Sequence, residues 1–145
     1  MAERKVAALL AGPGMMGRKA VGRLDMAEVV AKGLPQAALA RVKSACGLSD
    51  REIASALGSS AKTIGRLRKT PRTPLGAVAS DRLYRLARIF ATAQAVFDDA
   101  TLAREWLHGR QVGLGSRVPF DLLKTEAGAR EVEDLLGRIE HGVLS

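Results

Sequence analysis

Cysteine, histidine and aromatic residues are scarce in this chain of 145 residues. It contains one cysteine, Cys46, and two histidines, and aromatic residues make up 3% of the sequence. A single cysteine excludes an internal disulfide and is typical of a cytoplasmic protein. His108 and His141 have no cysteine partner and no metal-ligand spacing, so we expect no metal site. The shortage of aromatic rings argues against a platform on which single-stranded nucleic acid stacks.

Long apolar runs are also missing. The apolar stretch from Val6 to Ala11 is too short for a signal peptide and lies between Glu3 and Pro13. No segment approaches the roughly 20 apolar residues of a membrane helix. We therefore expect a cytoplasmic protein with no membrane contact. Hydrophobic residues make up 47% of the chain, with many Ala and Leu and few β-branched residues, which favours an all-α fold.

Residues 80–145 show no group of side chains suited to catalysis. They lack a nucleophile beside a base and a pair of acids, and the Gly-Leu-Gly at 113–115 lacks the Lys and Ser/Thr of a phosphate-binding loop. We expect a binding protein rather than an enzyme, with no cofactor and no small-molecule substrate. What these residues offer is apolar surface suited to a core and to a protein interface, from Trp106, Leu107, Leu114, Phe120, Leu122 and Leu123.

The positive charge is concentrated in the first part of the chain. Residues 1–80 contain 14 Lys and Arg against 5 Asp and Glu, a balance of +9, whereas residues 81–145 contain 9 against 10, a balance of −1. A basic segment joined to a neutral one suggests that the first meets a polyanion and the second meets another partner. A basic surface that only confers solubility is the alternative.

Composition divides the chain into three predicted regions. Residues 1–33 are basic and rich in glycine, which predicts an N-terminal arm with at most a short helix near residues 25–32. Residues 34–79 are predicted to form a helix-turn-helix DNA-binding domain of the phage-repressor type. Residues 80–145 are predicted to form a small helical domain for dimerisation and partner binding.

Capping residues and helix breakers mark the predicted helix boundaries. The first core helix follows Pro35 and stops at Gly47. Ser49 and Glu52 form a capping box for the next helix, and Ser60 caps the third. In the second half the corresponding signals, in chain order, are Ser80 after a connector over residues 71–80, Asp98 or Asp99, Gly109, Pro119, Thr125 and Gly142.

The segment DREIASALGSSAKTIGRLRK, residues 50–69, has the spacing of a helix-turn-helix. Ala54 is small where the two helices cross, and Gly58 permits the left-handed turn between them. Ile64 and Leu67 recur on the inner face of the second helix, where they fix the angle between the helices. The sequence therefore predicts that the second helix is a recognition helix.

The outer face of this second helix carries hydroxyl groups and cations. A helix of this kind fits the major groove of DNA, where Ser, Thr and Arg reach base edges and Lys meets phosphates. Arg68 and Arg72 suit the DNA backbone better than the bases. The predicted DNA-binding residues are Ser60, Lys62, Thr63, Arg66, Arg68 and Lys69.

One further expectation and one alternative concern how this motif is used. Helix-turn-helix modules commonly bind DNA as dimers, so we expect a homodimer. The alternative to DNA binding is a helical hairpin within a bundle, with a solvated charged face.

An ordered set of residues in the second half points to a family. It consists of Trp106-Leu107, Gly113-Leu114-Gly115, Pro119-Phe120-Asp121-Leu122-Leu123, Thr125, Gly128, Val132, Leu135, Ile139 and His141-Gly142. This order resembles the C-terminal domain of Xre/ParS/MbcA-type antitoxins. Together with the helix-turn-helix, the resemblance covers residues 35–145. Ser116 stands where a glycine often follows Leu114-Gly115, which puts only the loop conformation in doubt.

The resemblance implies an antitoxin that also represses transcription. Members of this family bind and silence a RES-domain toxin that consumes NAD, and they repress their own operon through the helix-turn-helix. The end of the chain would then lie at the toxin's active-site entrance and block NAD. The toxin-binding residues implied are His141, Gly142, Val143, Leu144 and Ser145.

Two other functions stay open at this point. The chain is a stand-alone transcription regulator if its second half only dimerises, and expression beside the adjacent reading frame distinguishes this from an antitoxin. It is a pure interaction module if the helix-turn-helix is vestigial, and a gel shift on the upstream promoter distinguishes that case.

Overall fold

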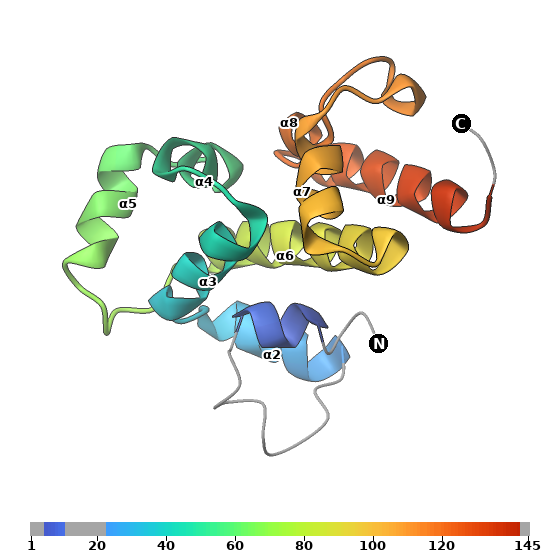
Figure 1. The fold of residues 1–145 in the computed structure, drawn as a ribbon. Helices are drawn as coiled ribbons and strands as arrows, with labels where there is room; N and C mark the ends of the chain where they lie inside the picture. Colours follow the sequence, from blue (N-terminus) through green and yellow to red (C-terminus); the bar gives the residue numbers. More distant parts are fainter. Residues whose placement is uncertain (1–4, 11–22, 143–145) are drawn as a thin grey trace. The chain divides into compact units, whose positions relative to one another are not determined.

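The structure is a computed structural model that describes residues 5–10 and 23–142. These residues form helices joined by short connections, and among them β-structure is limited to one isolated bridge between Gln111 and Arg117 (Figure 1). The predicted all-α fold is therefore confirmed. Contacts divide the chain into two compact units, Met1–Arg88 and Ile89–Ser145, which we call the first and second units.

The first unit begins with two helical segments in the predicted arm, and the second of them confirms the short helix expected near residues 25–32. Residues 5–10 are helical, and α2 spans Arg23–Lys32. Val6 and Leu10 lie four residues apart, so they share a helix face, and both are buried. Met26 of α2 is buried as well. The described parts of this region thus contribute to a core, because their apolar residues are buried on one face of each short helix.

Three helices follow in the first unit: α3 (Gln36–Cys46), α4 (Asp50–Ala56) and α5 (Ala61–Arg68). Gly47 ends α3 in the left-handed conformation, with a φ of 65°, as predicted. The contacts between α4 and α5 fit the expected hairpin of short helices. The buried side chains of α3 are Ala38, Leu39, Val42 and Cys46.

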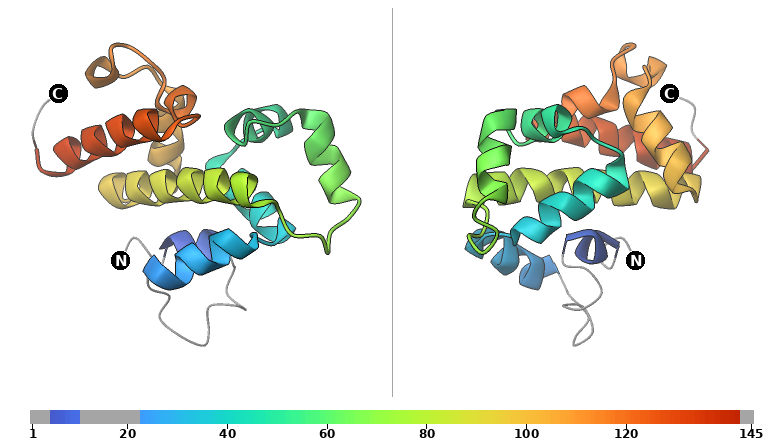
Figure 2. Two further views of the ribbon diagram at one scale, coloured as in Figure 1. Left: turned by 180° about the vertical axis from the view of Figure 1, so that it is seen from behind. Right: turned by 60° about the vertical axis from the view of Figure 1, so that its left-hand side comes forward.

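The helix α6 (Ala77–Phe97) is the longest, and it begins earlier than predicted. Ser80, expected to cap its start, lies inside the helix and is completely buried. Its hydroxyl accepts a hydrogen bond from the Leu34 amide at 2.8 Å and donates one to the Leu75 carbonyl at 3.4 Å. The predicted start was wrong because this hydroxyl makes tertiary contacts instead of capping. α6 is uninterrupted in each view, and the division between the two units falls within it (Figure 2).

The second unit contains the end of α6 and four further elements. These are α7 (Ala100–His108), the 3-10 turn η1 (Val112–Leu114), α8 (Pro119–Leu122) and α9 (Glu126–Glu140). α7 packs against α8, and both α8 and η1 pack against α9.

The helix starts predicted in the second unit are confirmed. The Asp99 carboxylate accepts a hydrogen bond from the Leu102 amide at 2.9 Å and caps α7. Pro119 occupies the first turn of α8. The Thr125 hydroxyl accepts a hydrogen bond from the Gly128 amide at 3.0 Å and caps α9. Each of these signals is local, so the sequence alone sufficed to find it.

Candidate nucleic-acid and partner-protein sites

The turn between α4 and α5 has the geometry that the sequence predicts. The Ser49 hydroxyl accepts a hydrogen bond from the Glu52 amide at 3.1 Å, and the Ser49 amide donates one to the Glu52 carboxylate at 3.0 Å. After α4, Gly58 adopts a left-handed φ of 68°, which a residue without Cβ reaches without strain. The Ser60 hydroxyl then accepts a hydrogen bond from the Thr63 amide at 3.1 Å and starts α5.

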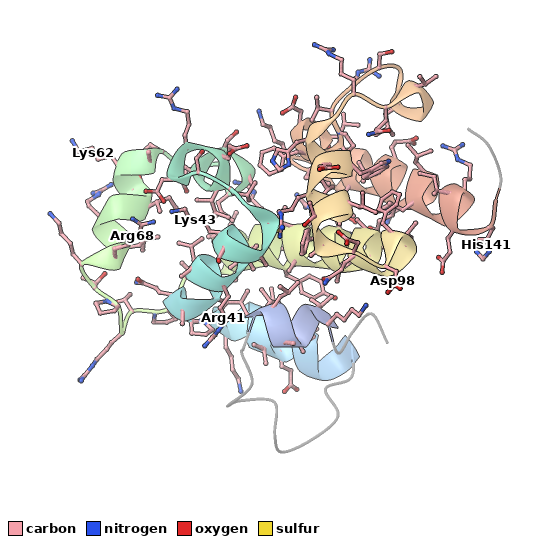
Figure 3. The ribbon with its side chains drawn as sticks, in the orientation of Figure 1. Arg41, Lys43, Lys62, Arg68, Asp98 and His141 are labelled. Carbon is pink, nitrogen blue, oxygen red and sulfur yellow. The ribbon has the colours of Figure 1, made fainter. Side chains whose placement is uncertain are left out.

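The helix α5 turns one narrow apolar face inward. Ile64 is buried and Leu67 is half-buried, as expected for its inner face. Lys62 points away from the body of the helix (Figure 3). Of the six predicted DNA-binding residues, Thr63 is half-buried and the other five, Ser60, Lys62, Arg66, Arg68 and Lys69, are exposed.

Three of the predicted base-reading residues are linked along α5. The hydroxyl oxygens of Ser60 and Thr63 are 3.0 Å apart, and the Arg66 guanidinium donates to the Thr63 hydroxyl at 3.4 Å. Residues three apart lie on neighbouring turns of one helix face, so the hydroxyls hold the guanidinium along the helix. With the exposed Lys62 and Lys69, they form what we call the α5 strip.

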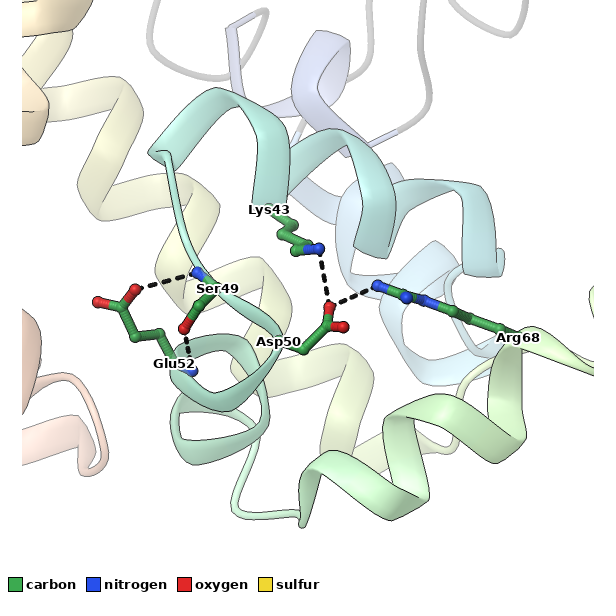
Figure 4. A network of polar contacts seen from close by, with 5 residues as sticks. All are labelled: Lys43, Ser49, Asp50, Glu52 and Arg68. Carbon is green, nitrogen blue, oxygen red and sulfur yellow. Dashed lines mark hydrogen bonds and ion pairs between the residues drawn. The ribbon is translucent and has the colours of Figure 1, made fainter.

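Arg68 makes a different contact and turns toward α3 (Figure 3). Its guanidinium donates to the carboxylate of Asp50 at the start of α4, and the ammonium group of Lys43 on α3 lies 2.8 Å from the same oxygen (Figure 4). One carboxylate therefore joins three helices. The hydrogen bond from Lys43, followed by the charge of Arg68, lowers the pKa of Asp50 below its ordinary value of 3.8.

Arg82 of α6 holds the turn between α4 and α5. Its guanidinium donates to the Leu57 carbonyl at 2.8 Å in a partly buried position. It also fills the space beside Gly58, where an added Cβ would lie 2.0 Å from Arg82 Nη1. The glycine thus serves both the left-handed turn and the approach of the guanidinium. Sequence reasoning missed this contact, because the two residues lie far apart in the chain and no local pattern links them.

The second unit has an apolar core between short helices. The rings of Phe97 and Trp106 have centroids 5.8 Å apart, and the His108 ring stacks on Phe120 at 5.4 Å. His108 also places its Nδ1 2.9 Å from the Arg104 carbonyl oxygen. The core role expected for the apolar residues is confirmed for Leu107, Leu114, Phe120 and Leu123, which are buried, while Trp106 and Leu122 are half-buried.

The connection from α7 to α8 contains the unusual Ser116. This residue has a φ of 63°, next to Gly115 with a φ of 64°, so the serine adopts a left-handed conformation that glycine adopts more readily. Its amide donates to the Gln111 carbonyl at 2.9 Å. The loop therefore takes a left-handed turn without a glycine at this position.

The helix α9 ends where the predicted toxin-binding residues begin. His141 caps its C-terminus, and Gly142 follows with a φ of 72°; both are exposed (Figure 3). Val143, Leu144 and Ser145 lie outside the described residues. The last turns of α9 form an open hollow of about 390 Å³, which is lined by Glu133, Asp134, Gly137, Arg138 and His141.

Membrane spans and metal clusters are not found among the described residues. Within residues 5–10 and 23–142, no helix is long and apolar enough to span a membrane. In the same part of the chain, no three His, Cys, Asp or Glu side chains come together in a way that could hold a metal ion.

Family models match both units. Residues 25–88 match the antitoxin Xre-like helix-turn-helix domain, and residues 92–142 match the antitoxin Xre/MbcA/ParS C-terminal toxin-binding domain. The first range contains the turn and α5, and the second contains α7 to α9.

Three relatives that are named antitoxin Xre are similar to the chain. The one from Yersinia enterocolitica is 40% identical over 95 residues, which cover 65% of this chain and 64% of the relative. The one from Pseudomonas putida is 39% identical over 69 residues, covering 48% and 43%. The one from Photorhabdus laumondii is 30% identical over 118 residues, covering 81% and 79%. The match thus spans less than two thirds of the first two relatives and most of the third.

Proposed function

Because the chain belongs to the Xre family of antitoxins, we propose that it neutralises a RES-domain toxin that consumes NAD and represses its own operon. In this proposal the segment from His141 to Ser145 blocks the toxin's active site. The helix α5 enters the major groove of operator DNA. The protein acts as a homodimer in the cytoplasm and uses no cofactor.

The main support for DNA binding is the composition and exposure of the α5 strip. Its cations and the Ser60 hydroxyl are exposed and the Thr63 side chain is half-buried, while the opposite face of the helix is fixed by the buried Ile64. Hydroxyl and guanidinium groups read base edges, and ammonium groups neutralise phosphates. The charge balance of +9 over residues 1–80 adds a sequence-independent attraction to DNA.

Arg68 has a separate part in this proposal. Because its guanidinium is bound to Asp50, it positions α5 against α3 and α4 in the free protein. Arg68 contacts a phosphate only if its ion pair with Asp50 breaks or if its guanidinium binds the carboxylate and the phosphate together. We therefore assign the main DNA contacts to Lys62, Arg66 and Lys69.

The toxin-binding part is supported by the second unit. Residues 92–142 match a toxin-binding domain, and the apolar residues of that match are used mainly for its core. The end of α9 is exposed at His141 and Gly142, the first two of the five residues proposed to block the active site. A short apolar segment in this place is suited to fill an active-site entrance.

A gel shift with the promoter upstream of this chain tests DNA binding. We expect Lys62→Ala and Arg66→Ala each to weaken binding by roughly tenfold or more, because each removes a phosphate or base contact. Lys32→Ala is the matched control, since this exposed lysine of α2 belongs to the same unit but lies outside α5. Unchanged binding by the two α5 variants would remove the recognition helix.

Co-expression with the protein encoded by the adjacent reading frame tests the antitoxin part. We expect the full chain to copurify with that protein and to restore growth. Deletion of Gly142 to Ser145 is expected to abolish most of the growth protection and to leave the gel shift unchanged. Equal loss of both activities would contradict the proposed division. A neighbour that is harmless and does not copurify would favour a stand-alone regulator.

A further inference from the structure

We propose that the loop from Arg110 to Arg117 is a second contact surface for the toxin, with Val112 as its apolar anchor. This inference rests on the proposed function, since the occupant is the toxin that the second unit is proposed to bind. The complementary surface on the toxin is an apolar pocket bordered by carboxylates. It is separate from the active-site entrance that the C-terminal segment is proposed to block.

The first observation behind this proposal is the high exposure of the Val112 side chain. Its side chain is 85% exposed, compared with 64% for Val78 and 49% for Leu102. Single apolar residues are common on protein surfaces, so exposure alone does not indicate a binding site. The second residue after it, Leu114, is buried, and η1 packs against α9. The turn is thus anchored by one apolar side chain while another is presented to solvent.

The loop is held in one shape by hydrogen bonds. The Gln111 amide donates to the Arg117 carbonyl at 3.0 Å, and the Ser116 amide donates to the Gln111 carbonyl at 2.9 Å. The side-chain amide of Gln111 donates to the Trp106 carbonyl at 3.0 Å. A side chain carried on an ordered backbone leaves less of the chain to be ordered when a partner binds. Val112 is therefore prepared to act as an anchor.

The charges beside Val112 indicate the kind of partner. Arg110 and Arg117 are both exposed, and residues 110–117 contain no carboxylate. The Arg110 guanidinium donates to the Ser116 carbonyl at 3.1 Å, so its charge stays beside the tip of the loop. An apolar centre with a charged rim is typical of a protein interface. DNA phosphates would attract the arginines but would gain nothing from Val112.

The toxin is favoured over other proteins as the occupant because the loop belongs to the matched range. Residues 92–142 match a toxin-binding domain, and residues 110–117 lie in the middle of that range. The loop also precedes α8 and α9, and η1 packs on α9, the helix that leads to His141. A toxin held at the end of α9 therefore has a second attachment point within the same unit.

Binding kinetics with the protein encoded by the adjacent reading frame, made catalytically inactive for purification, test this inference. We expect Val112→Asp to weaken binding by roughly 30-fold or more, mainly through faster dissociation. Val112→Thr keeps the side-chain shape and is expected to lose about fivefold, because a hydroxyl enters the apolar pocket. Arg117→Gln is expected to slow association by about twofold to fivefold, as rim charges do.

Val78→Asp is the matched control. It makes the same substitution at an exposed valine of α6 in the first unit, and we expect unchanged toxin binding. Melting temperatures should stay equal for the Val112 and Val78 variants, because both side chains are mostly exposed. A uniform fall in melting temperature for the Val112 variants would mean that the loop acts only in folding.

The outcomes distinguish this inference from the proposed function. If the unmodified chain binds the toxin and Val112→Asp binds as tightly as Val78→Asp, the loop is not a contact, and the proposed function is unaffected. If the unmodified chain binds no toxin, both ideas fall. If the loop variants weaken operator binding, or convert a dimer into monomers, while toxin binding is unchanged, the loop serves DNA or self-association and the inference is overturned.

Discussion

The two units fix their helices by different means. In the first unit, side chains from distant positions join elements through polar contacts: Ser80 with Leu34, Arg82 with Leu57, and Asp50 with Lys43 and Arg68. In the second unit, local caps and an apolar core do most of this work. α4 and α5 have 7 and 8 residues, and isolated helices this short are not stable in water. The buried Ile64 and the polar contacts from other helices therefore together hold the proposed recognition helix in place.

The units also differ in charge. The balance of +9 in residues 1–80 contrasts with −1 in residues 81–145. A basic surface attracts a polyanion electrostatically over distances up to the Debye length. A neutral unit binds its partner through short-range contacts instead. The comparison therefore predicts two kinds of binding whose sensitivity to mutation and salt differs.

The largest effect is expected from Gly128→Ala, which should destabilise the fold of the second unit. A Cβ at this position would lie 2.0 Å from the Leu122 carbonyl oxygen, which is part of the backbone and cannot rotate away. We expect the overpacking to cost about 3 kcal/mol and to abolish toxin binding while operator binding remains. Calorimetry and the two binding assays measure this.

Gly137→Ala is the control for that change, because it places the same methyl group in the same helix. No atom lies within 4 Å of its added Cβ, so we expect a gain of up to about 1 kcal/mol from helix propensity. Equal melting temperatures for the two variants would show that α8 and α9 do not approach as described.

A smaller effect is expected in the first unit from Gly58→Ala. The left-handed turn becomes unfavourable by about 1 kcal/mol, and the displaced Arg82 loses a hydrogen bond worth about 1 kcal/mol. Operator binding should weaken together with stability, while toxin binding should not change. Chemical unfolding and the gel shift measure both quantities.

The double variant Gly58→Ala with Arg82→Ala sharpens this test. Removing the guanidinium also removes the clash, so we expect the double variant to lose less stability than the two single variants together. Strict additivity would show that Arg82 does not occupy the space beside Gly58.

The smallest effect is expected from Asp50. Its pKa is lowered in the folded protein, so its ion pairs stabilise the fold above the ordinary value of 3.8 and are lost as the pH falls through the lowered pKa. Asp50→Asn should be slightly less stable at neutral pH and equal to the unmodified chain in strong acid. The effect is small because the carboxylate is partly exposed. Melting curves of both proteins from neutral pH to strong acid measure this difference. A difference in melting temperature that persists in strong acid would contradict the prediction.

Features encoded within a few residues could be predicted from the sequence. The capping box at Ser49, the cap at Ser60 and the left-handed Gly58 each depend on the local chain, and each was found in the structure. The exposure of most of the α5 strip followed from the spacing of Ile64 and Leu67. Residues 143–145 of the predicted toxin-binding segment lie outside the described residues.

Contacts between distant residues could not be predicted in this way. The Ser80 hydroxyl reaches Leu34 across 46 positions, so the serine looked like an ordinary helix cap. Arg68 reaches Asp50 across 18 positions, which a single sequence does not reveal. The helical residues 5–10 were missed because a short apolar run among glycines resembles an arm. For Ser80 and Arg68 the deciding partner lies elsewhere in the chain, beyond the reach of a local pattern.

The most direct test compares how salt affects the two binding reactions of the unmodified chain. With Lys62, Lys69 and Arg72 on phosphates, operator affinity should fall by roughly 40-fold per module between 50 and 200 mM salt. Toxin affinity should fall by only about fivefold or less, since it depends on apolar burial with a few rim charges. Parallel losses in the two titrations would contradict the division of the chain into a DNA-binding unit and a toxin-binding unit.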